Sequence, residues 1–209
     1  MLPPIYLTGT LAEHRRGRVL KSTLNAHATM TLPNQPSIGL LFGSDFQEGS
    51  QEQQWFQWSQ EAGHTLLLIP PFKSTTCSIP ITWEAMRRKN PALMQNNSFL
   101  QALASEVQYE FRGQLQIAQP NGTWDDRSFC TIYYRKHPHS GIFALTSLPL
   151  WSLSVLDHSA ELQEWLATLY TLVGTSRIAS IEEQSDFQPQ PHHFTLLLHL
   201  ITGHWSFNG

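Results

Sequence analysis

The chain has 209 residues, of which 41% are hydrophobic, 11% aromatic and 14% charged, and its formal net charge at pH 7 is −3. The aromatic and aliphatic content is enough for a packed core, which excludes a disordered chain. The slightly negative charge excludes a globally basic nucleic-acid binder, and the length suits one domain or one domain with an appendage.

Residues 1–37 are interpreted as an N-terminal extension. Within it, the segment 3–8 could form a strand, and residues 11–26 fit a helix or a strand equally well. Pro33 and Pro36 mark a turn or linker that separates this part from the next.

The clearest pattern follows the linker. Ile38–Gly43 and Thr65–Ile69 are continuous apolar runs, which are typical of parallel strands buried on both faces. Between them, Gln51–Ala62 places Trp55, Trp58 and Ala62 at helical spacing, and the glycine that follows is a common helix end. The segment therefore predicts a βαβ unit with a right-handed crossover.

The second half of the chain carries more elements, and their order completes the predicted fold. They are two short helices at 82–89 and 97–106, an antiparallel hairpin of strands 107–118 and 128–135, a buried strand at 142–146, a helix at 159–173, a last strand at 177–181 and a closing helix at 193–201.

These elements predict an α/β fold. We expect a three-layer domain over residues 38–174 with a mostly parallel sheet and an antiparallel hairpin insertion around 107–135. The N-terminal extension, 1–37, and a C-terminal strand and helix extension, 175–209, flank this domain, and the second is expected to pack on it.

One block resembles a known superfamily. Leu40-Leu41-Phe42-Gly43, a loop, and then Trp55–Phe72 with the sequence Ala-Gly-His-Thr-Leu-Leu-Leu-Ile look like class I glutamine amidotransferase-like proteins, which have a flavodoxin-like α/β architecture. Gly141–Thr146, followed by a loop and a helix, resembles the end of the same fold. The likeness covers about residues 38–174 and implies a sandwiched parallel sheet.

The resemblance also supplies a test of chemistry. Catalytic members carry a nucleophilic cysteine in a Gly-x-Cys-x-Gly turn between a strand and a helix, where small neighbours relieve crowding. Cys77 has no flanking glycine, Cys130 lies inside a predicted strand, and the His-x-Glu pattern of the family is absent. The resemblance therefore implies the non-catalytic branch, and we lean against an enzyme.

Cys77 nevertheless carries an alternative hypothesis, a cysteine-dependent amidase or hydrolase. Lys73 and His64 are near it in the sequence and could activate its thiol. The competing interpretation is a loop or partly buried cysteine without a chemical role. With only two cysteines and no CxxC motif, we expect neither a disulfide framework nor a thiolate metal site.

Ser44 and Asp45 are candidate ligand-binding residues. They come directly after the first buried strand, at the edge where open α/β sheets bind ligands. The alternative is a polar loop that caps the next helix. No Gly-x-Gly-x-x-Gly or Walker motif is present, so we expect no cofactor. We also expect no metal, because His192, His193, His199 and His204 fit the solvent edge of a packing helix.

Basic side chains suggest a second kind of binding surface. Most of them fall in three places, namely Arg15, Arg16, Arg18 and Lys21, then Arg87, Arg88 and Lys89, then Arg135 and Lys136. If these groups converge, they would bind phosphates or an acidic protein surface, and if they do not, they are separate solvated patches. Trp151 lies in an apolar segment and is either a partner anchor or a plug over the sheet.

The first functional hypothesis is therefore a non-catalytic interaction or scaffold subunit of a multiprotein bacterial system, with protein partners. The alternatives are the Cys77 hydrolase and a binder of nucleic acid or of an acidic partner through the Arg and Lys clusters. We expect a cytoplasmic protein without membrane association, because the start lacks a basic region before an apolar run and no apolar stretch approaches the length of a bilayer.

Overall fold

The computed structural model describes residues 2–78, 82–113, 115–118 and 122–173. The chain divides into two units, 1–176 and 177–209, and the described residues all belong to the first. The predicted strand at 177–181 and the predicted helix at 193–201 lie outside the described residues.

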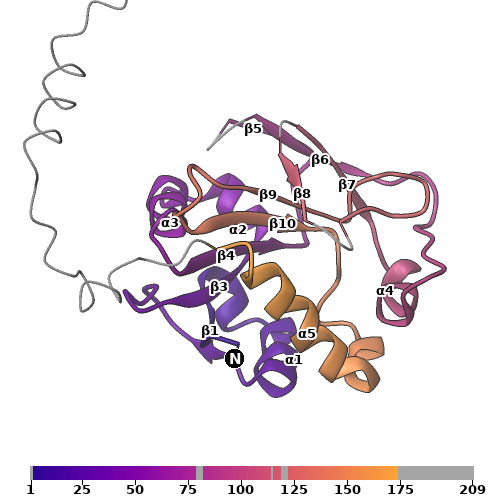
Figure 1. The fold of residues 1–209 in the computed structure, drawn as a ribbon, viewed down its shortest axis with the longest axis horizontal. Coiled ribbons are helices and arrows are strands. Elements are labelled where there is room, and N and C mark those ends of the chain that lie inside the picture. The colour runs from indigo at the N-terminus through magenta and orange to yellow at the C-terminus, as the bar shows by residue number, and fades with distance from the viewer. Residues whose placement is uncertain (1, 79–81, 114, 119–121, 174–209) are drawn as a thin grey trace, which may run out of the picture. The chain divides into compact units, whose positions relative to one another are not determined.

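The main sheet has seven strands in the order β2-β1-β3-β4-β10-β9-β8 (Figure 1). Five strands run parallel: β1 (Ile5–Leu7), β2 (His27–Ala28), β3 (Ser37–Phe42), β4 (His64–Ile69) and β10 (Ile142–Thr146). Two strands at one side are antiparallel, β9 (Thr131–Tyr134) and β8 (Gln116–Ile117). The prediction of a mostly parallel sheet is confirmed.

The centre of the main sheet is buried on both faces. Leu40 of β3 lies opposite Leu67 of β4, and Leu67 lies opposite Ala144 of β10. Every residue of β3, β4 and β10 is buried. Successive side chains of a strand point to opposite faces, so continuous burial requires cover on each side.

The two faces of the sheet are covered by the helices of two crossover connections that run in opposite directions. Strand β1 leads to β2 through η1 (Gly9–Ala12) and α1 (Arg15–Leu24), whereas β3 leads to β4 through α2 (Gly43–Glu48) and α3 (Glu52–Ser59). The two crossovers move in opposite directions across the sheet, and their helices belong to separate hydrophobic clusters. This is the doubly wound arrangement, with the parallel strands in the order 2-1-3-4-5.

The two apolar clusters define the three layers. On the first face, α1, α4 (Ser98–Ala104), η2 (Leu153–His158) and α5 (Ser159–Tyr170) pack on the sheet. On the second face lie α2, α3 and an antiparallel sheet of β5 (Thr76–Cys77), β6 (Trp83–Arg87) and β7 (Tyr109–Gly113). The α/β class and the predicted helices corresponding to α3, α4 and α5 are confirmed.

Three predictions of local structure differ from the structure. Residues 82–89 form strand β6 instead of a helix, because Trp83 and Ala85 alternate into the core against β5 and β7. The predicted strand 107–118 is divided at Gly113, so β7 joins the small sheet and only β8 pairs with β9. Residues 5–28 were expected in an N-terminal extension, but they form β1, α1 and β2, and both strands belong to the main sheet.

Gly113 explains the division of the predicted strand. Its φ is +145°, and an added Cβ would lie 2.7 Å from the carbonyl oxygen of Thr82. A side chain at this position would therefore clash with the backbone of the neighbouring strand. Glycine lets β7 end here, and the chain turns back toward the main sheet.

Among the described residues, no helix combines the length and the apolar character that crossing a membrane requires.

Candidate functional site at the carboxyl edge of the sheet

The carboxyl ends of β1 and β3 form the edge at which the topology of the sheet predicts a binding site. These strands are neighbours, and the chain leaves them toward opposite faces. In open α/β sheets, loops that diverge in this way leave a crevice in which ligands bind. Here the diverging segments are 8–14 after β1, which contains η1, and the first turn of α2 after β3. Ser44 and Asp45, expected in a polar loop, therefore lie in this helical turn.

Asp45 joins the two loops. Its Oδ2 accepts a hydrogen bond from the backbone N–H of Thr10 at 2.8 Å, and the Thr10 hydroxyl donates to both carboxylate oxygens at 2.8 and 3.0 Å. The backbone N–H of Ser44 donates to the carbonyl of Pro71 at 2.8 Å. Both residues therefore lie at the predicted edge, where their hydrogen bonds hold the rim together.

Arg16, in the first turn of α1, lies over two aromatic rings at this edge of the sheet. Its Cζ is 4.3 Å from the ring centroid of Trp151 and 5.9 Å from that of Phe42. The two rings meet edge to face at 6.1 Å. Trp151 is partly buried, packs against the first hydrophobic cluster and presents a face to the guanidinium. Arg16 and Trp151, both predicted to bind a partner, are thus brought together.

The start of α1 fixes the position of Arg16. His14 caps the helix, because its Nδ1 accepts a hydrogen bond from the backbone N–H of Arg16 at 3.1 Å. The His14 ring also packs edge-on against Phe42 at 5.4 Å. Gly17 lets the helix approach η1, since an added Cβ would lie 2.1 Å from the carbonyl oxygen of Leu11.

The charge of Arg16 is not compensated by another described residue. Its side chain is half-buried, and its guanidinium makes no hydrogen bond or ion pair in the described part of the chain. Burial is the main cause that lowers the pKa of Arg16, the neighbouring Arg15 lowers it further, and Tyr109 acts in the opposite direction. A desolvated cation of this kind gains free energy when an anion approaches it.

The second basic group reaches the same surface in part. The Cζ of Arg87 is 6.0 Å from the ring centroid of Tyr109, whose ring packs edge-on against Phe72 at 5.5 Å. Tyr109 also acts electrostatically on Arg16, in the direction that raises its pKa. Phe42 and Tyr109 are buried, so the groups open to a partner are the side chains of Arg16, Arg87 and Trp151. We call Arg16, Arg87 and Trp151, with the buried rings of Phe42 and Tyr109, the arginine–aromatic surface.

The other predicted basic residues lie elsewhere or face solvent. Arg88 has a side chain only 3% exposed, which ion-pairs with Asp126 and donates to Ser128 and to the Asn90 carbonyl, so it serves the fold. Arg15, Arg18 and Lys89 are exposed. Arg135 follows β9 and donates to the carbonyl of Leu172 at 3.0 Å, beyond the amino end of β10.

The structure does not gather the predicted activators around Cys77. Cys77 is buried in β5, opposite Trp83. His64 lies at the amino end of β4, so roughly 17 Å of strand separates it from the end that leads to Cys77. The Nζ of Lys73 is 2.7 Å from the Oε1 of Glu48, a partner that occupies it away from a thiol.

Cys130 is fully buried beside β9, and burial raises the pKa of its thiol to about 12. At pH 8 its thiolate is therefore scarcer than that of an ordinary cysteine by at least about a hundredfold. We expect iodoacetamide to label the Cys77→Ser variant at pH 8 at least a hundred times more slowly when folded than in urea. Mass spectrometry of the labelled peptide measures this, and equal rates would contradict the burial of Cys130.

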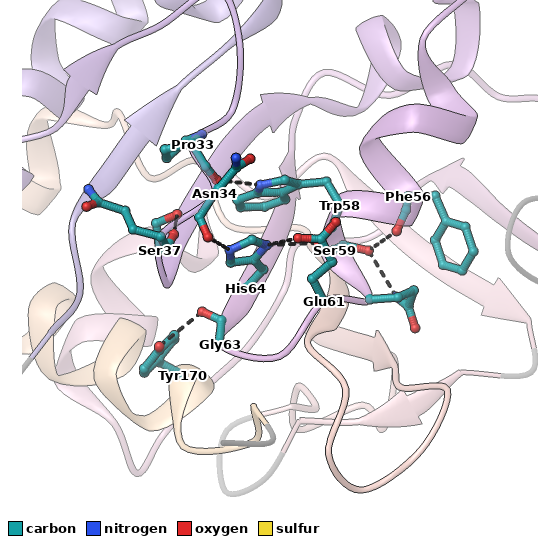
Figure 2. Close-up of polar contacts among 12 residues, drawn as sticks. Pro33, Asn34, Ser37, Phe56, Trp58, Ser59, Glu61, Gly63, His64 and Tyr170 are labelled. Carbon is teal, nitrogen blue, oxygen red and sulfur yellow. Dashed lines mark hydrogen bonds and ion pairs between the residues drawn. The ribbon is translucent and has the colours of Figure 1, made fainter. Parts of the chain in front are cut away.

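His64 builds a polar cluster at the opposite edge that the sequence did not reveal (Figure 2). Its buried ring stacks on Trp58, with centroids 4.3 Å apart and an angle of 17°. Its Nδ1 lies 3.1 Å from the Trp58 carbonyl and 3.6 Å from the Oε2 of Glu61, and its Nε2 lies 3.3 Å from the Asn34 carbonyl. The ring therefore ties α3, β4 and the loop before β3 together.

Searches with protein-family models, against curated proteins and against solved structures find no match to this chain. The resemblance to the amidotransferase-like superfamily therefore stays a prediction.

Proposed function

We propose that the protein is a non-catalytic interaction subunit that binds an acidic segment of a partner protein through the arginine–aromatic surface. The observation that carries this proposal is Arg16, a half-buried cation over Trp151 and Phe42 without a counter-ion among the described residues. A partner carboxylate supplies the missing charge and accepts two parallel N–H hydrogen bonds from the guanidinium.

The surroundings of Arg16 favour a protein partner over a nucleic acid. Leu153 and Leu156, which follow Trp151 in the chain, are 74% and 51% exposed and offer apolar area to a protein partner. Aromatic rings and arginine carry much of the binding free energy at protein interfaces. A nucleic acid would instead need many phosphate contacts, which the net charge of −3 opposes.

The placement of the cysteines supports a non-catalytic role. The thiol of Cys130 is buried and has a raised pKa, which disfavours the nucleophilic thiolate. Cys77 lies in a short strand of the small sheet, apart from His64 and Lys73. The Cys77 hydrolase therefore gains no support from the geometry.

A direct test uses a fluorescein-labelled peptide of alternating glutamate and leucine pairs in a polarisation assay. We expect binding that Arg16→Gln weakens at least tenfold, because the partner carboxylate then loses its charged partner. Lys136→Gln is the matched control, since it removes the same charge from an exposed residue after β9 and should leave the affinity unchanged.

Four outcomes decide the proposal. A lysine–leucine peptide of the same length should not bind, and higher salt should weaken the glutamate peptide moderately. Equal affinity of Arg16→Gln and the unaltered protein would overturn the proposal. Tight binding of a DNA duplex with a steep salt dependence would overturn it in favour of a nucleic-acid binder.

A further inference from the structure

A concave site lies between α3 and the segment 30–34, on the face of the main sheet that α3 covers. The hollow has a volume of about 250 Å³, and the residues that matter for recognition are Asn34, Gln51, Gln54, Trp55, Gln57 and Glu61. We call it the α3 hollow. It is separate from the arginine–aromatic surface, since none of its lining residues belongs to that surface.

Primary amides dominate the polar wall of the α3 hollow. Gln51, Gln54 and Gln57 follow each other at intervals of three along one side of α3, and Asn34 faces them from the loop. The three glutamines are exposed, and no hydrogen bond engages any of the four side-chain amides in the described part of the chain. Each amide offers a donor and an acceptor side by side.

The apolar wall is held firmly in place. Trp58 is buried, and its indole N–H donates to the Pro33 carbonyl at 2.8 Å, which binds α3 to the loop. His64 stacks on the Trp58 ring and approaches the Asn34 carbonyl, as Figure 2 shows. Trp55 stacks on Phe46 with ring centroids 6.4 Å apart. Because these side chains are already fixed, a ligand that binds here loses less free energy to ordering them.

From this lining we infer that the α3 hollow binds a neutral polyhydroxylated ligand, a sugar of one or two rings. Neighbouring hydroxyl groups of a sugar each donate and accept, which matches paired amide N–H and C=O groups. The C–H face of a sugar ring is apolar and suits the ring of Trp55, which is partly exposed, whereas Trp58 is buried and supports the wall. The volume of about 250 Å³ lies just below the usual range for ligand sites, about 300–1,000 Å³, which limits the ligand to a small one.

Charge selects against acidic ligands. Glu61 is the one charged side chain among the lining residues, and its carboxylate lies 3.6 Å from the Nδ1 of His64. An anionic ligand would meet that carboxylate at close range. A neutral hydroxyl group can instead donate to it.

Saturation-transfer NMR of the full chain with maltose, cellobiose and lactose as probes tests the inference. We expect saturation of at least one sugar, together with shifts of Trp indole resonances. The Gln54→Ala/Gln57→Ala double variant should bind at least tenfold more weakly, because each lost amide hydrogen bond costs about fivefold in affinity. Gln53→Ala is the matched control, since Gln53 is exposed on the same helix outside the hollow.

Each result has a definite meaning. Loss of binding in the double variant, with retention in Gln53→Ala and unchanged urea unfolding of both, supports the sugar site. No saturation of any probe, or equal saturation in all variants, overturns it. Binding of N-acetyl-trialanine amide in place of the sugars overturns the ligand class in favour of a peptide backbone. This experiment uses no Arg16 variant, so its result does not depend on whether the arginine–aromatic surface binds an acidic partner.

Discussion

Replacing Gly141 with alanine is expected to lower the free energy of unfolding by about 3 kcal/mol, at the upper end for an overpacked core. An added Cβ would lie 2.4 Å from the carbonyl oxygens of Ser59, Glu61 and His64. These are backbone atoms of the turn between α3 and β4, so no side-chain rotation can relieve the clash. Urea denaturation followed by Trp fluorescence measures the change.

His139→Ala is the control for this experiment. His139 is exposed in the same loop, two residues earlier, and truncating it should change stability by less than about 0.5 kcal/mol. An equally small effect of Gly141→Ala would mean that β10 does not begin against the α3–β4 turn.

The second large effect is expected at the ion pair between Asp126 and Arg88. The Arg88 side chain is 3% exposed and that of Asp126 is 44% exposed. Asp126→Asn leaves a buried guanidinium without its counter-ion. Removing one partner of a fully buried ion pair lowers the free energy of unfolding by several kcal/mol. Because the carboxylate of Asp126 is partly exposed, we expect a smaller decrease of about 2 kcal/mol at pH 7.

The pH dependence gives this prediction its sign. Burial alone would raise the pKa of Asp126, but hydrogen bonds from Ser128 and the Arg88 guanidinium outweigh it and lower the pKa. Folding therefore favours the ionised carboxylate, and the stabilisation is present above the ordinary pKa of 3.8 and is lost as the pH falls through the lowered value.

Urea denaturation between pH 7 and pH 2.5 checks this sign. The difference in the free energy of unfolding between the unaltered protein and Asp126→Asn should be largest at neutral pH and should decrease below about pH 4. Asp125→Asn changes the exposed neighbour and should show no such difference. A gap that stays constant down to pH 2.5 would contradict the ionised pair as its cause.

The central βαβ unit could be predicted because its strands are buried on both faces. Only such strands need continuous apolar runs, and the 38–43 and 65–69 segments have them with a helical pattern between. The register, with Leu40 opposite Leu67, is a finding of the structure, because strand direction alone does not decide which residues face each other.

Residues 82–89 show where local preference misleads. Glu84, Ala85 and Met86 are good helix formers, so the segment predicts a helix. Yet Trp83 and Ala85 have the period of two that a strand requires, and pairing with β5 and β7 stabilises the extended chain. Tertiary contacts far along the chain, which no local window contains, decide the outcome.

The candidate site could be predicted only in outline. Asp45 and Ser44 lie at the carboxyl edge because they follow a buried strand, and that position is a local property. The contact of Arg16 with Trp151 depends on the placement of α1 and of the loop after β10 around the same edge. Neither Tyr109 nor Phe42 carried a sequence signal for that surface, since both resemble ordinary core residues.

The long excursion between β4 and β10 has a consequence for biosynthesis. Residues 70–141 must leave the ribosome before β10 can pair with β4, which takes roughly 4–14 s at common elongation rates. Until then, the apolar edge of β4 stays open to other chains. We expect the nascent protein to engage a chaperone during this interval and to release it once Phe143 and Leu145 have closed the sheet.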